Sequence, residues 1–210
     1  LFDSLRELHP SVKVSVKLVS GAHIGAIAAG VVKAGADIVQ VSGGAGGTGA
    51  APLSSMMHAG LPWEIGLVDV HQTLLEHGLR ERVILRVDGG LHRGREIVMA
   101  ALLGADEFAF GKSLLIAEGC IMARVCETNK CPRGIATQDP KFKAKYKGAP
   151  EQVASLLEVL AEDTRRHLAR MGVRSIQQIV GKANRFLQPS KQHKAIIAEL
   201  NFCLLYTSPS

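Results

Sequence analysis

The sequence predicts an α/β protein built on a parallel β-sheet, and three observations lead to this fold class. Short runs rich in β-branched residues recur through the first 110 residues, apolar segments of helical length separate them, and the runs lead into glycine-rich loops. Parallel strands need long crossover connections, which the helical segments provide. Four such βα units form either an open parallel sheet or half of a (β/α)8 barrel.

The expected elements alternate regularly up to the cysteine-rich part of the chain. From alternation and β-branched content we expect strands over residues 12–19, 36–42, 83–87 and 107–110. From their apolar content and helical length we expect helices over residues 24–34, 65–78 and 95–103. Farther on, apolar residues at helical spacing predict an amphipathic helix over residues 151–171 that starts at Pro150, and then a short helix that ends near Val180.

Composition limits the classes of function. The four cysteines suggest a reducing compartment without a disulfide framework, and no apolar run reaches membrane-spanning length, so we expect no membrane partner. The net charge of +6 is densest over residues 141–147, where no nucleic-acid motif accompanies the lysines. We therefore expect a solvated surface and no nucleic-acid partner; a docking surface for an acidic electron donor is the alternative.

Cys120, Cys126 and Cys131 form the most informative motif, which ends in a Cys-Pro step. Structural cysteines behave as small hydrophobes and have no reason to recur among polar residues. Zinc sites usually take cysteines in closely spaced pairs, and no second pair is present here. Iron–sulfur clusters accept irregular runs of cysteine, and three thiolates favour a three-iron cluster, because a cubane without one iron needs one ligand fewer. Zinc, and reduced structural thiols or disulfides, are the alternatives.

Two glycine turns follow the third and fourth expected strands and suit a phosphate group. Their residues are Asp88, Gly89, Gly90, Gly111, Lys112 and Ser113. On a barrel, backbone N–H groups in such turns hold the phosphate of flavin mononucleotide (FMN), with helix N-termini pointing at the ligand. Two ordinary strand-to-helix turns are the alternative.

Lys17 and a glycine-dense loop add groups that suit a flavin ring. A cation near the end of the first strand stabilises the negative charge that a reduced flavin develops; a surface lysine is the alternative. The loop from residue 42 brings backbone close to a flat ring, because glycine lacks the Cβ that would collide. Its candidate contact residues are Ser42, Gly43, Gly46 and Gly47. His23, at the start of the next helix, is a candidate for contact with substrate.

These residues together resemble the synthase domain of the glutamate synthase large subunit. The likeness covers about residues 12–181 and rests on an ordered set of segments. They are Lys17-Leu18-Val19, Ile27-Ala28-Ala29-Gly30-Val31, Ser42-Gly43, Gly46-Gly47-Thr48-Gly49-Ala50, Pro62-Trp63-Glu64, Val87-Asp88-Gly89-Gly90-Leu91 and Cys120-x5-Cys126-x4-Cys131. The sequence departs from the family at Lys112, where small residues are common, and at Gly44, Ala45 and Ala51, where polar residues are common.

The resemblance implies the C-terminal half of an FMN-binding (β/α)8 TIM barrel of about four βα units, then a cysteine-rich loop and C-terminal helices. The half barrel would occupy residues 1–118, the iron–sulfur loop region 119–150, a helical extension 151–182, and a non-native or disordered tail 183–210. Cys120, Cys126 and Cys131 would bind a [3Fe–4S] cluster. Lys17 would touch flavin or substrate as the catalytic residue, and the glycine loops would hold FMN.

In that family, ammonia released from glutamine condenses with 2-oxoglutarate, and reduced FMN delivers hydride to 2-iminoglutarate to give L-glutamate. The resemblance implies this reaction, with electrons from ferredoxin or from a partner subunit carrying NADPH-reduced FAD. It implies a cytoplasmic or plastid-stromal location and a further partner, the remainder of the same large subunit. We expect this stretch alone to hold FMN weakly and to be inactive. The alternatives are a related FMN and iron–sulfur oxidoreductase without glutaminase activity, and a non-catalytic electron-transfer module.

Overall fold

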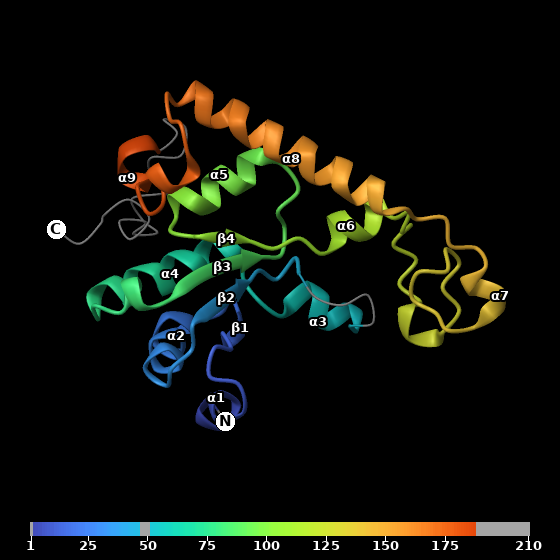
Figure 1. Ribbon diagram of the computed structural model, residues 1–210, viewed down its shortest axis with the longest axis horizontal. Coiled ribbons are helices and arrows are strands. Elements are labelled where there is room, and N and C mark those ends of the chain that lie inside the picture. The colour runs from blue at the N-terminus through green and yellow to red at the C-terminus, as the bar shows by residue number, and fades with distance from the viewer. Residues whose placement is uncertain (1, 47–50, 188–210) are drawn as a thin grey trace.

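The computed structural model describes residues 2–46 and 51–187 (Figure 1). Four strands form one sheet: β1 (Ser15–Val19), β2 (Ile38–Ser42), β3 (Ile84–Asp88) and β4 (Glu107–Phe108). Their order in the sheet is their order in the chain, and every neighbouring pair is parallel. The predicted α/β class with a parallel sheet is confirmed, although β1 begins later and β4 ends earlier than the sequence pattern suggested.

The sequential strand order determines where the helices lie. Right-handed crossovers between successive neighbouring strands place their helices on the same face of a sheet. α2 (Ile24–Lys33), α4 (Trp63–Glu76) and α5 (Gly94–Leu102) are these crossover helices and pack against the strands (Figure 1). The core between the helices and the sheet contains fully buried side chains, among them Ala28, Val39, Val41, Leu67, Val70, Leu74, Leu85, Val87 and Ala100.

The opposite face of the sheet carries a polar row. Lys17, Gln40, Arg86 and Glu107 are register partners across the four strands. Because successive side chains of a strand alternate between faces, this row lies opposite the buried valines and leucines. Arg86 and Glu107 form an ion pair with 2.6 Å between Nη2 and Oε2. The face that would line the inside of a barrel is therefore charged rather than apolar.

Several short helices had not been expected from the sequence. These are α1 (Phe2–Leu8), α3 (Leu53–His58), α6 (Lys112–Ala117) and α7 (Pro140–Lys143), together with single 3-10 turns at Arg80–Arg82 and Cys126–Thr128. α1 is held to the sheet by Arg6, whose Nη2 lies 3.0 Å from Asp37 Oδ2 and 2.6 Å from Gly35 O. The 3-10 turn at Ile176–Gln178 stands where the short helix ending near Val180 was expected.

The long amphipathic helix is present as α8 (Pro150–Arg170), with Pro150 in its first turn as predicted. It packs along α5 (Figure 1), where Gly94 N–H donates to Asp163 Oδ2 at 2.7 Å. A Cβ on Gly94 would collide with the backbone of Asp163 and Thr164, so only glycine permits this approach. Several residues at the helical spacing noted in the sequence face the core: Leu160, Thr164 and Leu168 are buried. Leu157, which follows the same spacing, is 41% exposed.

The C-terminal part of the described chain continues past the expected boundary at residue 182. α9 (Ala183–Phe186) follows, and Ala183 is buried in the main core. Residues 188–210, including Cys203, lie outside the described residues. Among the described helices, none is long and apolar enough to span a membrane.

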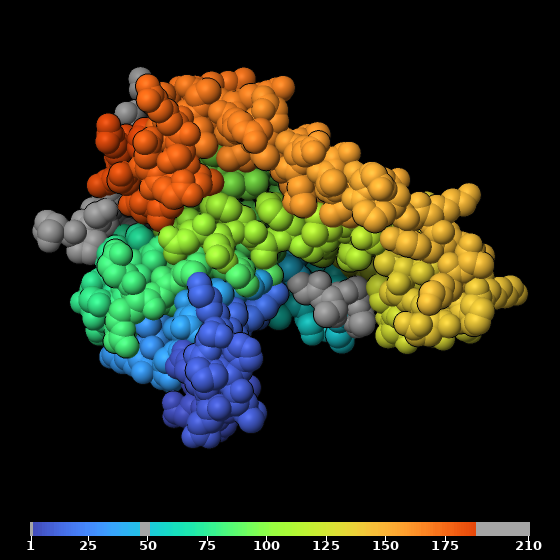
Figure 2. Space-filling model, in the orientation of Figure 1, coloured from blue at the N-terminus to red at the C-terminus, as the bar shows by residue number. Residues whose placement is uncertain are grey.

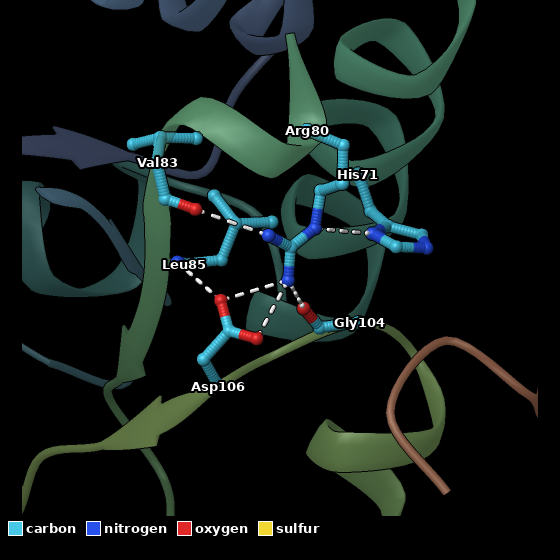
Figure 3. Close-up of polar contacts among 6 residues, drawn as sticks. All are labelled: His71, Arg80, Val83, Leu85, Gly104 and Asp106. Carbon is cyan, nitrogen blue, oxygen red and sulfur yellow. Dashed lines mark hydrogen bonds and ion pairs between the residues drawn. The ribbon is translucent and has the colours of Figure 1, made fainter. Parts of the chain in front are cut away.

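Arg80 ties together the ends of β3 and β4 that lie away from the glycine turns (Figure 3). Its guanidinium donates to Val83 O, Gly104 O and both carboxylate oxygens of Asp106, at 2.7 to 3.1 Å. Its Nε donates to His71 Nδ1 at 3.1 Å, so the acceptor nitrogen of His71 is unprotonated. Burial, and then the nearby Arg80 charge, lower the pKa of His71 from 6.5 to about 4.

We expect acid to destabilise the fold through His71. The folded state keeps the imidazole of His71 neutral, whereas the unfolded chain protonates it near pH 6.5. The free energy of unfolding is therefore highest above pH 6.5 and decreases as the pH falls from 6.5 towards 4. The loss amounts to about 3 kcal/mol, from about 1.4 kcal/mol per pKa unit. Denaturant unfolding at pH 7.5 and pH 4.5 measures it. His71→Gln keeps an acceptor for Arg80 but does not titrate, so its loss over the same interval should be smaller. An equal loss in both proteins would contradict this assignment.

Candidate functional site

The carboxyl ends of the strands gather most of the predicted cofactor residues around one cavity of about 260 Å³, which we call the turn cavity. The residues predicted from sequence that line it are Lys17, Gly46, Asp88, Gly89, Gly90, Gly111, Lys112 and Ser113. The two glycine turns therefore face each other across one space. A Cβ on Gly111 would meet no other atom within 4 Å, so the backbone of this glycine is open to that space.

A second cavity, of about 340 Å³, lies beside the first, and we call it the loop cavity. It is lined by Ser42 and Gly43 from the glycine-dense loop and by residues of α3, and it shares Lys17 and Gly46 with the turn cavity. Gly47, the remaining predicted contact, lies outside the described residues. The shared residues make the two cavities adjoining parts of one site.

Two of the predicted glycines serve the contact between the loops. Gly43 N–H donates to Asp88 O at 2.9 Å, and a Cβ on Gly43 would lie 2.8 Å from Gly89 O. Gly89 has φ +89°, and a Cβ there would lie 2.8 Å from Gly43 N. The glycine-dense loop and the first turn can touch only because both positions lack a side chain.

Asp88 is the hydrogen-bonding centre of the site. Its Oδ2 accepts from Lys17 Nζ at 2.6 Å and from Gln40 Nε2 at 2.7 Å, and its Oδ1 accepts from Ser42 Oγ. Lys17 stands in the middle of β1 rather than at its end, and it reaches Asp88 across β2. A carboxylate repels phosphate, so the side chain of Asp88 is suited to orienting Lys17, while the turn that follows it is suited to the phosphate.

Gln40 and His92 belong to the site but had not been predicted. Gln40 is a register partner of Lys17, which only the strand pairing reveals. His92 lines the turn cavity, and its Nδ1 lies 2.9 Å from Ser113 Oγ, which links the two glycine turns. A signal was present for His92, because it follows the first glycine turn by two residues. His23 is exposed at the start of α2 with φ +60° and is not among the residues that line either cavity.

The three motif cysteines line one further cavity of about 170 Å³, the cysteine cavity. All three are free thiols; Cys131 is buried, Cys120 is half-buried and Cys126 is exposed. Between the first two, Met122 and Arg124 both have φ +56°, a left-handed conformation that costs a non-glycine residue about 1 kcal/mol or more. These residues bend the loop between two cysteines that face the same space.

Backbone N–H groups are directed at two of the sulfurs, those of Cys131 and Cys120. Burial raises the pKa of the Cys131 thiol, but hydrogen bonds from the N–H groups of residues 133–136 outweigh it and leave that pKa below its ordinary value. Met122 N–H donates to Cys120 Sγ at 3.4 Å. The Cys131 sulfur is thus prepared to carry negative charge, as metal-bound thiolates do.

The cysteine region, residues 119–150, projects from the rest of the molecule beyond α6 (Figures 1 and 2). It is internally braced: Thr137 Oγ1 donates to Asn129 O at 2.6 Å, and Gln138 N–H donates to Asn129 Oδ1 at 2.7 Å. Arg133 Nε donates to Gly119 O at 2.9 Å, which closes the loop at its base. The cysteines are therefore held by a folded loop rather than by the sheet.

Comparison with known proteins agrees with this geometry. The family model described as "Conserved region in glutamate synthase" matches residues 1–174. The ferredoxin-dependent glutamate synthase of Cyanidium caldarium is 57% identical over 182 residues, which are 87% of this chain and 12% of that protein. The NADPH glutamate synthase large chain of Azospirillum brasilense is 52% identical over 191 residues, which are 91% of this chain and 13% of that protein. The chain thus spans about an eighth of the length of these relatives.

Solved structures show the same fold at low sequence identity. The flavin-binding domain of baker's yeast flavocytochrome b2 matches with a TM-score of 0.58 at 17% identity, over 100% of this chain and 44% of that one. A mandelate oxidase mutant with a monooxide FMN adduct matches with a TM-score of 0.54 at 18% identity, over 87% of this chain and 45% of that one. Because the family model covers most of the chain and relatives are more than half identical to it, this chain belongs to the glutamate synthase family.

Proposed function

We propose that this chain forms the cofactor-binding part of a glutamate synthase, which aminates 2-oxoglutarate reductively through 2-iminoglutarate, with glutamine-derived ammonia, to give L-glutamate. One observation carries the proposal: the turn cavity and the cysteine cavity adjoin and share Gly111 and Lys112 as wall residues. When bound, FMN would supply hydride transfer, and a [3Fe–4S] cluster would supply single electrons.

The turn cavity fits the phosphate end of FMN. Its two turns present glycine backbone, Lys112 adds a cation, and α6 begins at the second turn. Ser113 Oγ, which hydrogen-bonds His92 Nδ1, adds a hydroxyl group that can donate a hydrogen bond to phosphate. We assign phosphate binding to these residues, and to Ser42, Gly43 and Gly46 the approach of backbone to the ring.

Lys17 is the proposed catalytic residue, because it lines both adjoining cavities and its side chain is 54% exposed towards them. A cation there stabilises negative charge that develops on a flavin or a substrate carboxylate. Asp88 holds it in place, with Gln40 and Ser42 fixing the carboxylate.

We assign the cysteine cavity to a cluster rather than to a single ion. Among the described residues, no three His, Cys, Asp or Glu side chains are gathered closely enough for one metal ion. A multi-iron core separates its thiolates more widely than one ion does, and three cysteines around one cavity match that need. N–H donors to Cys120 and Cys131 are the hydrogen bonds that tune such clusters.

The open four-stranded sheet supports a half barrel that the rest of a larger subunit completes. Four strands in sequential order, a charged face and a match to 44% of a flavin-binding domain support the second half of a (β/α)8 barrel over residues 1–118. The cysteine region would then occupy 119–150 and the helical extension 151–182. The remainder of the large subunit would close the barrel and supply ammonia.

Relatives named as ferredoxin-dependent and as NADPH enzymes support either kind of electron donor. We propose a cytoplasmic or plastid-stromal location.

Asp88→Asn should make the reduction potential of bound flavin more positive. The change removes the negative charge that offsets Lys17 at 2.6 Å, so added electrons on the flavin are stabilised more strongly. A spectroelectrochemical titration measures it. Glu107→Gln is the matched control, since it removes a carboxylate from the same face but one that pairs with Arg86. Equal shifts in the two variants would contradict the role of Asp88.

The proposed function is tested by purifying the protein that carries this chain and recording its visible and EPR spectra. We expect a flavin spectrum, an EPR signal of an oxidised three-iron cluster, and glutamate formed from 2-oxoglutarate and glutamine with a reduced donor. Residues 1–210 alone should retain little FMN and show no turnover, because they match only 44% of a flavin-binding domain and would enclose the flavin incompletely. A full-length protein with neither chromophore would overturn the proposal.

A further inference from the structure

Three cavities of this chain share walls, and the shared residues are few. Gly111 and Lys112 line both the turn cavity and the cysteine cavity. Met56, from α3, lines both the loop cavity and the cysteine cavity. Of these three residues, only Lys112 carries a charge.

Lys112 bridges two loops on this wall. It is half-buried at the start of α6, and its Nζ donates to Ala45 O in the glycine-dense loop at 2.5 Å. A parallel contact joins the cysteine loop to α3, where Arg124 Nη1 lies 2.8 Å from Met56 Sδ. The ammonium of Lys112 is thus held at the turn cavity by a backbone oxygen, which carries no charge, while the residue itself also lines the cysteine cavity.

The charge of Lys112 is not neutralised within the described part of the chain. There, Lys17 pairs with Asp88 and Arg86 pairs with Glu107, but no carboxylate makes an ion pair with Lys112. The field of a cation without a counter-charge reaches farther than that of an ion pair, because no opposite charge cancels it. Partial burial also reduces the screening of that field by salt. Lys112 therefore acts on negative charge in either cavity.

We propose that Lys112 is the electrostatic link between the flavin and the iron–sulfur cluster, a positioning residue that raises the reduction potentials of both. The inference rests on the proposed function. Each centre gains one negative charge per electron, and one ammonium on their common wall stabilises both reduced forms. It also reduces the repulsion between an electron on the cluster and an electron on the flavin, which eases the passage of single electrons from one to the other.

The test measures both potentials in the intact protein that carries this chain, by EPR-monitored titration for the cluster and visible titration at saturating FMN for the flavin. Lys112→Met should move both midpoint potentials to more negative values, and Lys112→Arg should keep both near the wild-type values. Lys141→Met removes one charge from α7, outside the three cavities, and should move neither appreciably.

A purely phosphate-binding role predicts a different pattern. Lys112→Met would then weaken FMN binding, measured by flavin fluorescence, and leave the cluster potential unchanged, which would overturn the inference. If the variant loses FMN altogether, the cluster potential alone decides, and Lys112→Gln replaces Lys112→Met if the latter does not fold. A wild-type protein without flavin or cluster signals would instead refute the proposed function, so the two failures are distinguishable.

Discussion

Cys131→Ala is expected to abolish the proposed iron–sulfur cluster of the intact protein while leaving the proposed flavin bound. Cys131 is the buried member of the three, at 9% exposure, and four backbone N–H groups are directed at its sulfur. A three-iron core has no spare thiolate in this loop, so the loss of one ligand leaves an iron without its anchor. Iron and sulfide analysis with EPR measures the loss, and visible absorption measures the flavin.

Two comparisons sharpen that result. Cys203→Ser removes the remaining cysteine of the chain, which lies outside the motif, and should leave the iron content unchanged. Cys126→Ala should also remove the cluster. Cys126 is exposed, but cluster binding depends on whether a cysteine ligates iron and not on whether it is buried. Full iron content in Cys131→Ala would show that Cys131 is not a ligand of the proposed cluster.

Arg80→Met should lower the free energy of unfolding by about 3 kcal/mol, because it removes one partner of a largely buried ion pair. The Arg80 side chain is 11% exposed and the Asp106 side chain is 31% exposed. The change also leaves Val83 O and Gly104 O without the guanidinium that donates to them (Figure 3). It removes one cause of the lowered pKa of His71, so the acid sensitivity described above should decrease as well. Denaturant unfolding at pH 7.5 and pH 4.5 measures both effects.

Arg166→Met is the matched control for this stability prediction. Arg166 pairs with Glu162 on the surface of α8, with 69% and 50% of the two side chains exposed. Exposed pairs contribute about 0.5 kcal/mol, so this variant should be close to the wild type in stability. Losses of similar size in the two variants would contradict the structural role of Arg80.

Local sequence patterns predicted the strands and the longer helices because those patterns act over a few residues. β2 and β3 contribute Val39, Val41, Leu85 and Val87 to the core, and the runs that contain them are the clearest strand signals in the chain. The short helices α3 and α6 went unpredicted, because a helix of six residues has too few turns to display a period. The end of β1 was predicted well, but Lys17 lies farther inside it than expected.

Most residues of the candidate site were predicted from sequence motifs, but Gln40, His92 and the internal arrangement of the site were not. The glycine turns and the cysteines were visible as motifs, and the structure places them around adjoining cavities. The role of Asp88 was not visible, because its partners Lys17 and Gln40 lie 71 and 48 residues away along the chain. Strand register brings them together, and register depends on contacts between segments rather than on any one segment.

The sequence by itself determined the parallel α/β class, the residues of the two glycine turns and the three-cysteine motif, since each depends on spacing along the chain. Only the tertiary structure decided that Asp88 neutralises Lys17, that His92 joins Ser113, and that Lys112, between the turn cavity and the cysteine cavity, has no carboxylate partner among the residues described. The physical reason is range: a charge is neutralised or left unpaired by whatever folding brings within a few ångströms, and in this chain those neighbours come from different strands and loops.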